Sequence, residues 1–208
     1  LSDVLPTYAS NMSGKHISLN VSEGLKLPQS LSRELDTNTS IEMEFTFNLT
    51  DVGDGDGFMY IMTNQPGVNG NGFSIHSRHY FFYEDPDAYE VVFTYADGGY
   101  NRGIPDHPGH NETRIAFLNA GDEVTINLIL DFKANQWSAL VNGVYTSGLF
   151  DSAYDINLIK QSITDNEIYI GWTEYQAQEM EYDPSIFTSS ATFDKLAFYS
   201  PRQAGNAN

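Results

Sequence analysis

The feature that most constrains the fold is a strict alternation of apolar and polar side chains over residues 41–49, with the sequence IEMEFTFNL. Every odd position is apolar and every even position is polar, which is the period of a β-strand with one buried face and one solvated face. A helix could not keep these side chains on one face, because its period is 3.6 residues. The same alternation returns in residues 124–130, 137–141 and 168–172. The chain is therefore predicted to be built on antiparallel sheets.

Shorter segments rich in β-branched and aromatic residues predict further strands, separated by turns of Gly, Pro, Asn and Asp. These segments are residues 17–21, 58–63, 72–76, 80–83, 89–95, 114–117 and 192–199. Asn142 and Gly143 follow the strand predicted at 137–141, and this dipeptide favours a tight β-hairpin. No segment has a convincing helical pattern. We expect an all-β fold, an antiparallel β-sandwich of the jelly-roll type.

The length and composition predict a single domain. Of the 208 residues, 40% are hydrophobic and 13% aromatic, which is enough for one substantial core. No break in composition divides the chain, so residues 1–208 are expected to form one domain with a frayed tail at 201–208. No apolar run is long enough to cross a bilayer. We expect no membrane insertion, and a monomeric module of a larger protein.

The charge of the chain excludes several classes of partner. With 28 acidic and 10 basic residues, the formal net charge is -18. Such a charge repels nucleic acids, anionic membranes and polyuronate chains. Cysteine is absent, so neither disulfides nor thiolate metal sites can form. The sequence therefore predicts no nucleic-acid partner.

Two acidic turns suggest a metal site. The turn at 51–57, DVGDGDG, holds three carboxylates, and these repel one another unless a hard cation such as calcium lies among them. The loop at 96–107 supplies further carboxylates, an amide and flexible glycines. Neither loop alone offers the ~6 to 8 oxygen ligands that calcium takes, so we expect a site shared between them. The predicted calcium ligands are Asp54, Asp56, Asp97, Asn101 and Asp106.

Several segments in chain order carry a family resemblance. They are the Asp-Gly strand segment at 56–61, the strand and loop at 90–106, the strand and Asn-Gly hairpin at 124–143, and the closing strands at 168–172 and 192–199. Together they resemble the concanavalin A-like lectin and glucanase superfamily, which includes legume-type lectins and laminin G-like modules. The resemblance implies a concanavalin A-like jelly roll that binds ligands on rim loops or on its concave face. In the lectin members, the aspartate of the Asp-Gly segment accepts hydrogen bonds from the ligand, and here that role falls on Asp56.

The resemblance also limits the metal content. Phe93 and Thr94 stand where the family has an acidic residue inside its metal-bearing strand. This departure argues against a transition-metal site beside the calcium and implies a single calcium ion or a differently arranged cluster.

Polar loops supply the other candidate ligand-binding residues. The loop at 63–72 offers amides, and the loop at 174–183 occupies the place where lectin members set specificity. Tyrosines offer flat faces for sugar rings or peptide side chains. A plain polar linker is an equal interpretation of the loop at 174–183. The candidates are Asp56, Asn64, Gln65, Asn69, Asn71, Tyr100, Tyr175, Gln176 and Gln178.

The histidines are a weaker candidate for chemistry. His107 and His110 flank a Pro-Gly turn, and His76 and His79 lie nearby in the sequence, which could suggest zinc. The turn gives no rigid ligand geometry, however, and calcium does not favour imidazole. We therefore expect solvent-exposed histidines.

A catalytic role finds little support in the sequence. The strand signature of the glucanases is Glu-x-Asp-x-x-Glu, and residues 34–39 end in Thr39 where the acid/base should stand. Glu179, Glu181 and Asp183 would share one face about 7 Å apart if extended, which is too wide for the ~5 to 5.5 Å of a retaining pair. A uronate lyase would need cations, which are scarce here. We expect no enzyme, with a glycoside hydrolase as the alternative.

The leading hypothesis is a calcium-dependent ligand-recognition domain of a bacterial surface adhesin. Its partner would be a cell-surface glycan or the C-terminus of a peptide or protein, and the sequence leaves both open. A purely structural spacer in a fibre is a third interpretation. An acidic, cysteine-free composition rich in Asn, Gly, Ser and Thr is typical of exported bacterial modules, so we expect an extracellular or cell-surface location.

Overall fold

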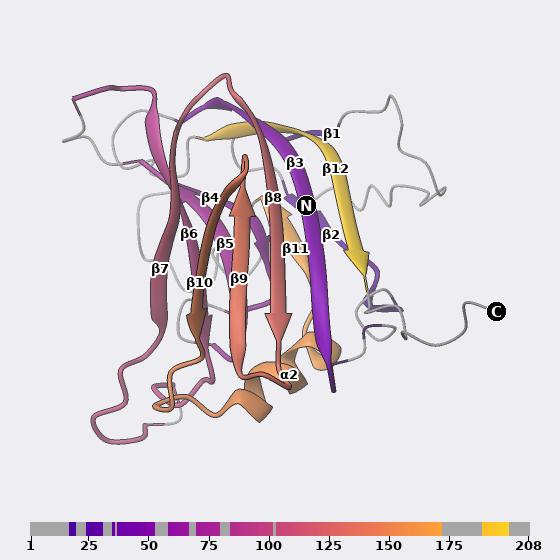
Figure 1. The fold of residues 1–208 in the computed structure, drawn as a ribbon, viewed down its shortest axis with the longest axis vertical. Coiled ribbons are helices and arrows are strands. Elements are labelled where there is room, and N and C mark those ends of the chain that lie inside the picture. Colours follow the sequence, from indigo (N-terminus) through magenta and orange to yellow (C-terminus); the bar gives the residue numbers. More distant parts are fainter. Residues whose placement is uncertain are drawn as a thin grey trace.

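The structure is a computed structural model that describes residues 17–19, 24–30, 35, 37–52, 58–66, 70–79, 84–101, 103–171 and 189–199. Two six-stranded antiparallel sheets pack face to face within these residues (Figure 1). Their strand orders are β1-β12-β3-β8-β9-β10 in the first sheet and β2-β11-β4-β5-β6-β7 in the second. This arrangement confirms the predicted antiparallel β-sandwich of the jelly-roll type.

The strands of both sheets follow most of the predicted segments. The first sheet contains β1 (Ile17–Leu19), β12 (Ser190–Tyr199), β3 (Ser40–Asp51), β8 (Glu123–Asp131), β9 (Gln136–Val141) and β10 (Val144–Leu149). The second contains β2 (Gly24–Lys26), β11 (Tyr169–Gly171), β4 (Phe58–Thr63), β5 (Gly72–Arg78), β6 (Ala88–Ala96) and β7 (Asn111–Asn119). The strand predicted at 80–83 and the tail at 201–208 lie outside the described residues.

The core forms where the alternating strands face each other. In β3, Phe45 and Phe47 are completely buried, as the sequence pattern predicts. Phe93 of β6 meets Trp137 of β9 with 5.0 Å between their ring centroids, which joins the two sheets. Burying aromatic and aliphatic side chains between the sheets supplies the main stabilisation of such a fold.

The hairpin between β9 and β10 forms at the predicted Asn-Gly turn. Asn142 and Gly143 adopt φ values of 46° and 84°, both in the left-handed region. A two-residue turn of this kind matches the right-handed twist of the strands that it joins, and Asn and Gly adopt it with the least strain. The sequence prediction is confirmed at this turn.

The expectation that no helix forms is wrong. Helix α2 (Ile156–Asp165) lies at the lower end of the sandwich in Figure 1. Its first turn is capped by Asp155, whose carboxylate accepts a hydrogen bond from the N–H of Asn157 at 2.9 Å. Ile159 and Ile163, one turn apart, are buried. The apolar stripe is so narrow, and its residues are so often β-branched, that the sequence does not distinguish this helix from a loop.

None of the helices in the described part of the chain has the length and apolar character that a membrane crossing requires.

Candidate ligand-binding pocket

The four strands β4 to β7 carry polar side chains on the face of the second sheet that points away from the core. In β5, Phe73 and Ile75 are buried in the core. Because side chains alternate along a strand, Ser74, His76 and Arg78 lie on the opposite face. The polar residues of this strand therefore gather on the face that points away from the core.

Strand register brings residues that are distant in the sequence onto this polar face. Tyr60 of β4 lies opposite His76. Thr94 of β6 lies opposite Ser74, and Glu112 of β7 lies opposite Thr94. Directly paired residues of antiparallel strands project from the same face, so these side chains surround one spot.

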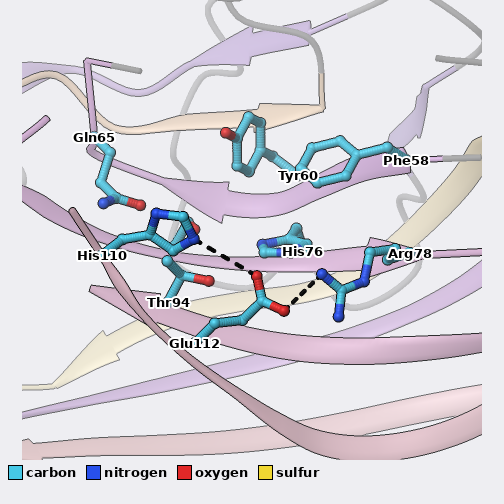
Figure 2. Close-up of a pocket in the computed structure, with 9 residues that line it drawn as sticks. Phe58, Tyr60, Gln65, His76, Arg78, Thr94, His110 and Glu112 are labelled. Carbon is cyan, nitrogen blue, oxygen red and sulfur yellow. Dashed lines mark ion pairs between the residues drawn. The ribbon is translucent and has the colours of Figure 1, made fainter. Parts of the chain in front are cut away.

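A pocket of about 90 Å³ is hollowed into this face. Pockets that enclose whole drug-sized ligands have about 300–1,000 Å³, so this one has room for a substituent of a larger ligand. Its lining residues, which are drawn in Figure 2, are Phe58, Tyr60, Gln65, Ser74, His76, Arg78, Thr94, His110 and Glu112.

Aromatic rings form one wall of the pocket. Phe58 stacks on the imidazole of His76 with 4.7 Å between the ring centroids. Tyr60 meets Phe58 edge to face at 4.9 Å and His76 edge to face at 6.0 Å. The mutual packing fixes all three rings, which pre-organises this wall.

Paired charges form the opposite wall. The guanidinium of Arg78 lies 2.9 Å from Glu90 and 2.6 Å from Glu112. Arg114 binds the second oxygen of Glu90 at 3.0 Å. Figure 2 shows Arg78 and His110 both directed toward Glu112, and the His110 Nε2 lies 3.8 Å from its carboxylate. Carboxylates and guanidinium groups balance each other here, although the whole chain is strongly acidic.

Two buried polar atoms in the pocket lack partners. The side chain of Thr94 is only 2% exposed and that of His76 only 6% exposed. Neither Thr94 Oγ1 nor His76 Nδ1 has a hydrogen-bond partner within the described part of the chain. Buried polar groups in folded proteins are nearly always hydrogen-bonded, so two such atoms lining one pocket call for a ligand or solvent.

Burial determines the charge of His76. It lowers the pKa of the imidazole from 6.5 to about 3, and the positive charges of Arg78 and His110 act in the same direction. His76 is therefore neutral at physiological pH. One ring nitrogen then donates a hydrogen bond and the other accepts one.

This shift makes the stability of the fold depend on pH. The folded chain binds the His76 proton less tightly than the unfolded chain. The contribution of neutral His76 to the free energy of unfolding is therefore fully present above pH 6.5 and is lost as pH falls toward about 3. The expected slope is about 1.4 kcal/mol per pH unit. Urea unfolding of the wild type and of His76→Gln between about pH 5 and pH 7 measures it. The difference between the two should change with pH, and parallel curves would contradict the shift.

The expectation of exposed histidines is wrong for most of those described. His76 and His79 are each 6% exposed, and the His107 side chain is equally buried. His79 is held by the carbonyl of Ala88 at 2.5 Å from its Nδ1. Polar groups inside the fold allow these rings to be buried, such as the carbonyl of Ala88 beside His79 and the carboxylate of Asp97 beside His107. The sequence around the Pro-Gly turn does not reveal these partners.

The structure places the amide candidates of the loop at 63–72 in different roles. Gln65, one of the ligand-binding candidates, lines the pocket. The side chain of Asn64 instead accepts a hydrogen bond from the N–H of Phe73 at 2.8 Å and donates one to Ser162 of α2 at 3.1 Å. Asn64 therefore fixes the connection between β4 and β5.

The other ligand-binding candidates do not line the pocket or lie outside the described residues. The backbone carbonyl of Asn71 accepts a hydrogen bond from Asn166 at 2.8 Å. Tyr100 is 57% exposed on its loop. The candidates that lie outside the described residues are Asp56, Asn69, Tyr175, Gln176 and Gln178.

The predicted calcium ligands that are described do not form a calcium site by themselves. Asp97 is only 3% exposed, and its two oxygens accept hydrogen bonds from the N–H groups of Gly99 and Asp155 at 2.7 and 2.8 Å. Asn101 and Asp106 are exposed on the loop. No group of three or more His, Cys, Asp or Glu within the described ranges could hold a metal ion. A calcium site would depend on Asp54 and Asp56, which lie outside them.

Most pocket residues escape sequence reasoning. His76, Thr94 and Glu112 are far apart in the chain and meet only through strand register. A signal was present in the strand predicted at 72–76, where Ser74 and His76 alternate with apolar residues. Strands that are buried on both faces are usually apolar on both. A strand of this kind with polar residues along one face is the pattern that could identify the site.

Comparison with known proteins identifies a fold and no family. No protein-family model matches the sequence, and no curated protein matches it. An alginate lyase in complex with dimannuronate is 8% identical with a TM-score of 0.54, covering 88% of this chain and 73% of that one. A botulinum neurotoxin type C chain is 10% identical with a TM-score of 0.51, covering 88% of this chain and 39% of the toxin chain. Cell uptake of that toxin depends on interaction with two ganglioside molecules.

A third solved structure is less similar. It is an alginate lyase from Pseudomonas aeruginosa, 14% identical with a TM-score of 0.48, covering 79% of this chain and 66% of that one. At these identities the likeness shows the fold alone, a β-sandwich. The finer resemblance to the concanavalin A-like superfamily stays a prediction.

Proposed function

We propose that this domain binds a glycan and that one substituent of a sugar enters the pocket over β4 to β7. The proposal rests on two buried atoms, His76 Nδ1 and Thr94 Oγ1, that have no hydrogen-bond partner in the described part of the chain. Leaving a buried polar group unpaired costs about 1–3 kcal/mol. A sugar hydroxyl both donates and accepts hydrogen bonds, so it can satisfy a neutral imidazole and a threonine hydroxyl alike.

The walls of the pocket suit a sugar. Aromatic rings pack against the apolar C–H face of a pyranose, and Phe58 and Tyr60 supply such rings. Gln65 adds an amide, and Arg78 and Glu112 add planar charged groups. A few convergent polar groups on a largely apolar surface are typical of small-molecule sites.

The balanced charges favour a glycan over the C-terminus of a peptide. Arg78 already has two carboxylate partners, Glu90 and Glu112. The carboxylate of a peptide would have to displace one of them. Hydroxyl groups need no such displacement, because they can add to the free lone pairs of the carboxylates.

The structural comparisons support a saccharide as the ligand class. One of the two similar folds is a lyase with bound dimannuronate, and the other belongs to a toxin that interacts with gangliosides. Dimannuronate and gangliosides both contain sugars, and each interacts with a protein that has a β-sandwich fold. The similarity is one of fold, so it does not choose between sugars.

We extend the proposal to a calcium-dependent, extracellular domain of a bacterial adhesin. The support for calcium is the acidic turn at 51–57. An ion held there would order the neighbouring loop before ligand binding, which lowers the entropic penalty of binding. The composition supports an exported protein.

A second candidate function is eliminative cleavage of an acidic polysaccharide at the same pocket. The neutral imidazole of His76 beside Arg78 favours it, because its Nδ1 has no hydrogen-bond partner among the described residues and elimination requires a base near a cation that neutralises the sugar carboxylate. A pKa of about 3 makes His76 a weak base at neutral pH, however, and Arg78 is already paired. Binding is therefore the better supported function. The hydrolase alternative depends on Glu179, Glu181 and Asp183, which lie outside the described residues.

Tyr60→Ala should abolish glycan binding, and Tyr100→Ala should preserve it. Both variants remove a tyrosine, but only Tyr60 lines the pocket. The measurement is a combined array of neutral glycans, acidic glycans and C-terminal peptides, probed with calcium and again with EGTA. Calcium dependence predicts loss of the signal in EGTA and its return with added calcium.

Other array outcomes separate the alternatives. Binding to peptides, or to nothing, would contradict the glycan proposal, and an unchanged signal in EGTA would contradict calcium dependence alone. Appearance of unsaturated uronate or new reducing ends in the bound glycan would favour the enzymatic alternative. Loss of that turnover in His76→Gln would assign it to this pocket.

A further inference from the structure

Strand β10 forms an open edge of the first sheet (Figure 1), and β9 is its sheet neighbour within the described strands. Its apolar side chains face solvent: Val144 is 65% exposed, Tyr145 is 67% exposed and Leu149 is 71% exposed. An open edge presents unpaired N–H and C=O groups to other chains. Natural sheets usually protect such an edge with charges, proline, a bulge or a covering segment.

Charges, proline and bulges are all missing from this hairpin. Residues 134–150 contain no charged residue and no proline, although the whole chain carries a formal net charge of -18. The pairing of β10 with β9 is regular along its full length, without a bulge. An exposed, regular and uncharged edge is expected to be covered by another strand.

We propose that β10 pairs with β10 of a second copy of this chain. The two strands would run antiparallel across a two-fold axis and join the first sheets of both copies into one continuous sheet. This proposal replaces the expectation of a monomeric module, and it is independent of the glycan site on the other sheet.

The absence of charge on the hairpin favours a second copy as the partner. Two copies of a strongly acidic chain repel each other over most of their surface. A two-fold contact places the same patch on both sides, so the contacting patch must itself lack charge. The hairpin at 134–150 meets this condition, whereas a basic partner would be attracted to the acidic surfaces instead.

The register of the pairing follows from the hairpin. Val141 and Val144 close the two-residue turn and face each other. Hydrogen-bonding direction alternates along an antiparallel strand, so Tyr145, Ser147 and Leu149 direct their N–H and C=O groups toward the open edge. These are the groups that a second strand would bind.

Placing Ser147 on the two-fold axis makes the strand complementary to itself. Tyr145 then lies opposite the partner's Leu149, and Leu149 lies opposite the partner's Tyr145. The strands would exchange about six backbone hydrogen bonds. Leu140, which is 41% exposed and lies opposite Tyr145 on β9, extends the apolar patch beside the contact. Aromatic and aliphatic pairs of this kind stabilise adjacent strands.

A single introduced cysteine tests this register. The chain has no cysteine, so Ser147→Cys creates one thiol per copy. On the axis the two Cα atoms would lie about 5.5 Å apart, within the range that a disulfide spans. Mild oxidation should give a covalent dimer on a non-reducing gel. Ser152 is an exposed serine outside β10, so Ser152→Cys is the matched control. It should give no covalent dimer on the same gel.

Sedimentation velocity completes the test. The wild type should sediment as a dimer, and Leu149→Lys should sediment as a monomer, because it replaces the apolar partner of Tyr145 with a lysine, which disfavours pairing at a sheet edge. Leu149 is already exposed, so circular dichroism should show an unchanged fold. A monomeric wild type, a dimeric Leu149→Lys variant, or Ser147→Cys that forms no more covalent dimer than Ser152→Cys would each overturn the proposal.

Discussion

Thr94→Val is expected to weaken glycan binding about 5- to 100-fold while leaving the fold as stable as the wild type or more stable. Valine keeps the shape of threonine and removes the hydroxyl, which is buried and has no partner within the described residues. Losing a buried hydrogen bond to the ligand costs about 1–3 kcal/mol, and 1.4 kcal/mol corresponds to a tenfold change in affinity. Removing an unpaired hydroxyl from the unliganded protein should gain up to about the same amount in stability.

Calorimetric titration with the glycan found on the array and urea unfolding measure the two effects of Thr94→Val. Thr46→Val is the matched control. Its hydroxyl lies in the first sheet, 3.2 Å from the hydroxyl of Thr125. Thr46→Val should therefore lose about 0.5–1.5 kcal/mol of stability and keep full affinity. Unchanged affinity in Thr94→Val would show that the hydroxyl does not bind the ligand. A clear loss of stability in this variant would show that the hydroxyl already has a partner in the unliganded protein.

Asp97→Ala is expected to lower the free energy of unfolding by about 3–5 kcal/mol, because it removes two hydrogen bonds to a buried carboxylate, each worth about 1.5–3 kcal/mol. The Asp97 carboxylate binds two backbone N–H groups, and its Oδ1 lies 3.1 Å from His107 Nε2. It thereby connects the end of β6 to the loop at 97–107 and to the start of α2. Gly99 belongs to the same arrangement, since a Cβ there would lie 2.5 Å from the ring of His107.

Asp106→Asn is the control for Asp97→Ala, because Asp106 is an exposed aspartate of the same loop and asparagine also tolerates its left-handed backbone, with φ 58°. Its effect should stay within about 0.5 kcal/mol. Urea unfolding in calcium and in EGTA separates the two roles considered for Asp97. A structural carboxylate predicts the same large loss in both buffers. A loss that appears only in calcium would instead make Asp97 a calcium ligand.

The sequence was sufficient for the parts of the fold that depend on local patterns. The alternation in β3 predicts its buried face, and the Asn142–Gly143 turn predicts the hairpin, because both signals lie within a few adjacent residues. Helix α2 was missed, because its buried stripe is narrow and its fold depends on packing against the end of the sandwich. Ile159 and Ile163 gave a helical spacing, but isoleucine is equally common in strands.

The candidate site was much harder to predict. Gln65 is a candidate from the sequence because its loop is rich in amides, and it lines the pocket. His76, Thr94 and Glu112 are not, because a polar side chain on a strand can be placed in a pocket only when its cross-strand neighbours are known. Asp97 shows what loop composition leaves out. Its position in a glycine-rich acidic loop predicts a metal ligand, which stays a prediction, and only the structure shows that each of its oxygens accepts a backbone hydrogen bond.

The central claim is that a glycan hydroxyl binds the neutral imidazole of His76. Nitrogen chemical shifts of the histidine rings, followed by NMR during titration with the glycan, test it most directly, and the His76 signals can be assigned by their absence in His76→Gln. Binding in the pocket predicts a saturable shift of His76 Nδ1 without protonation of the ring. If the glycan binds while the His76 nitrogens keep their shifts and signals near the Tyr100 loop move instead, the pocket is not the glycan site.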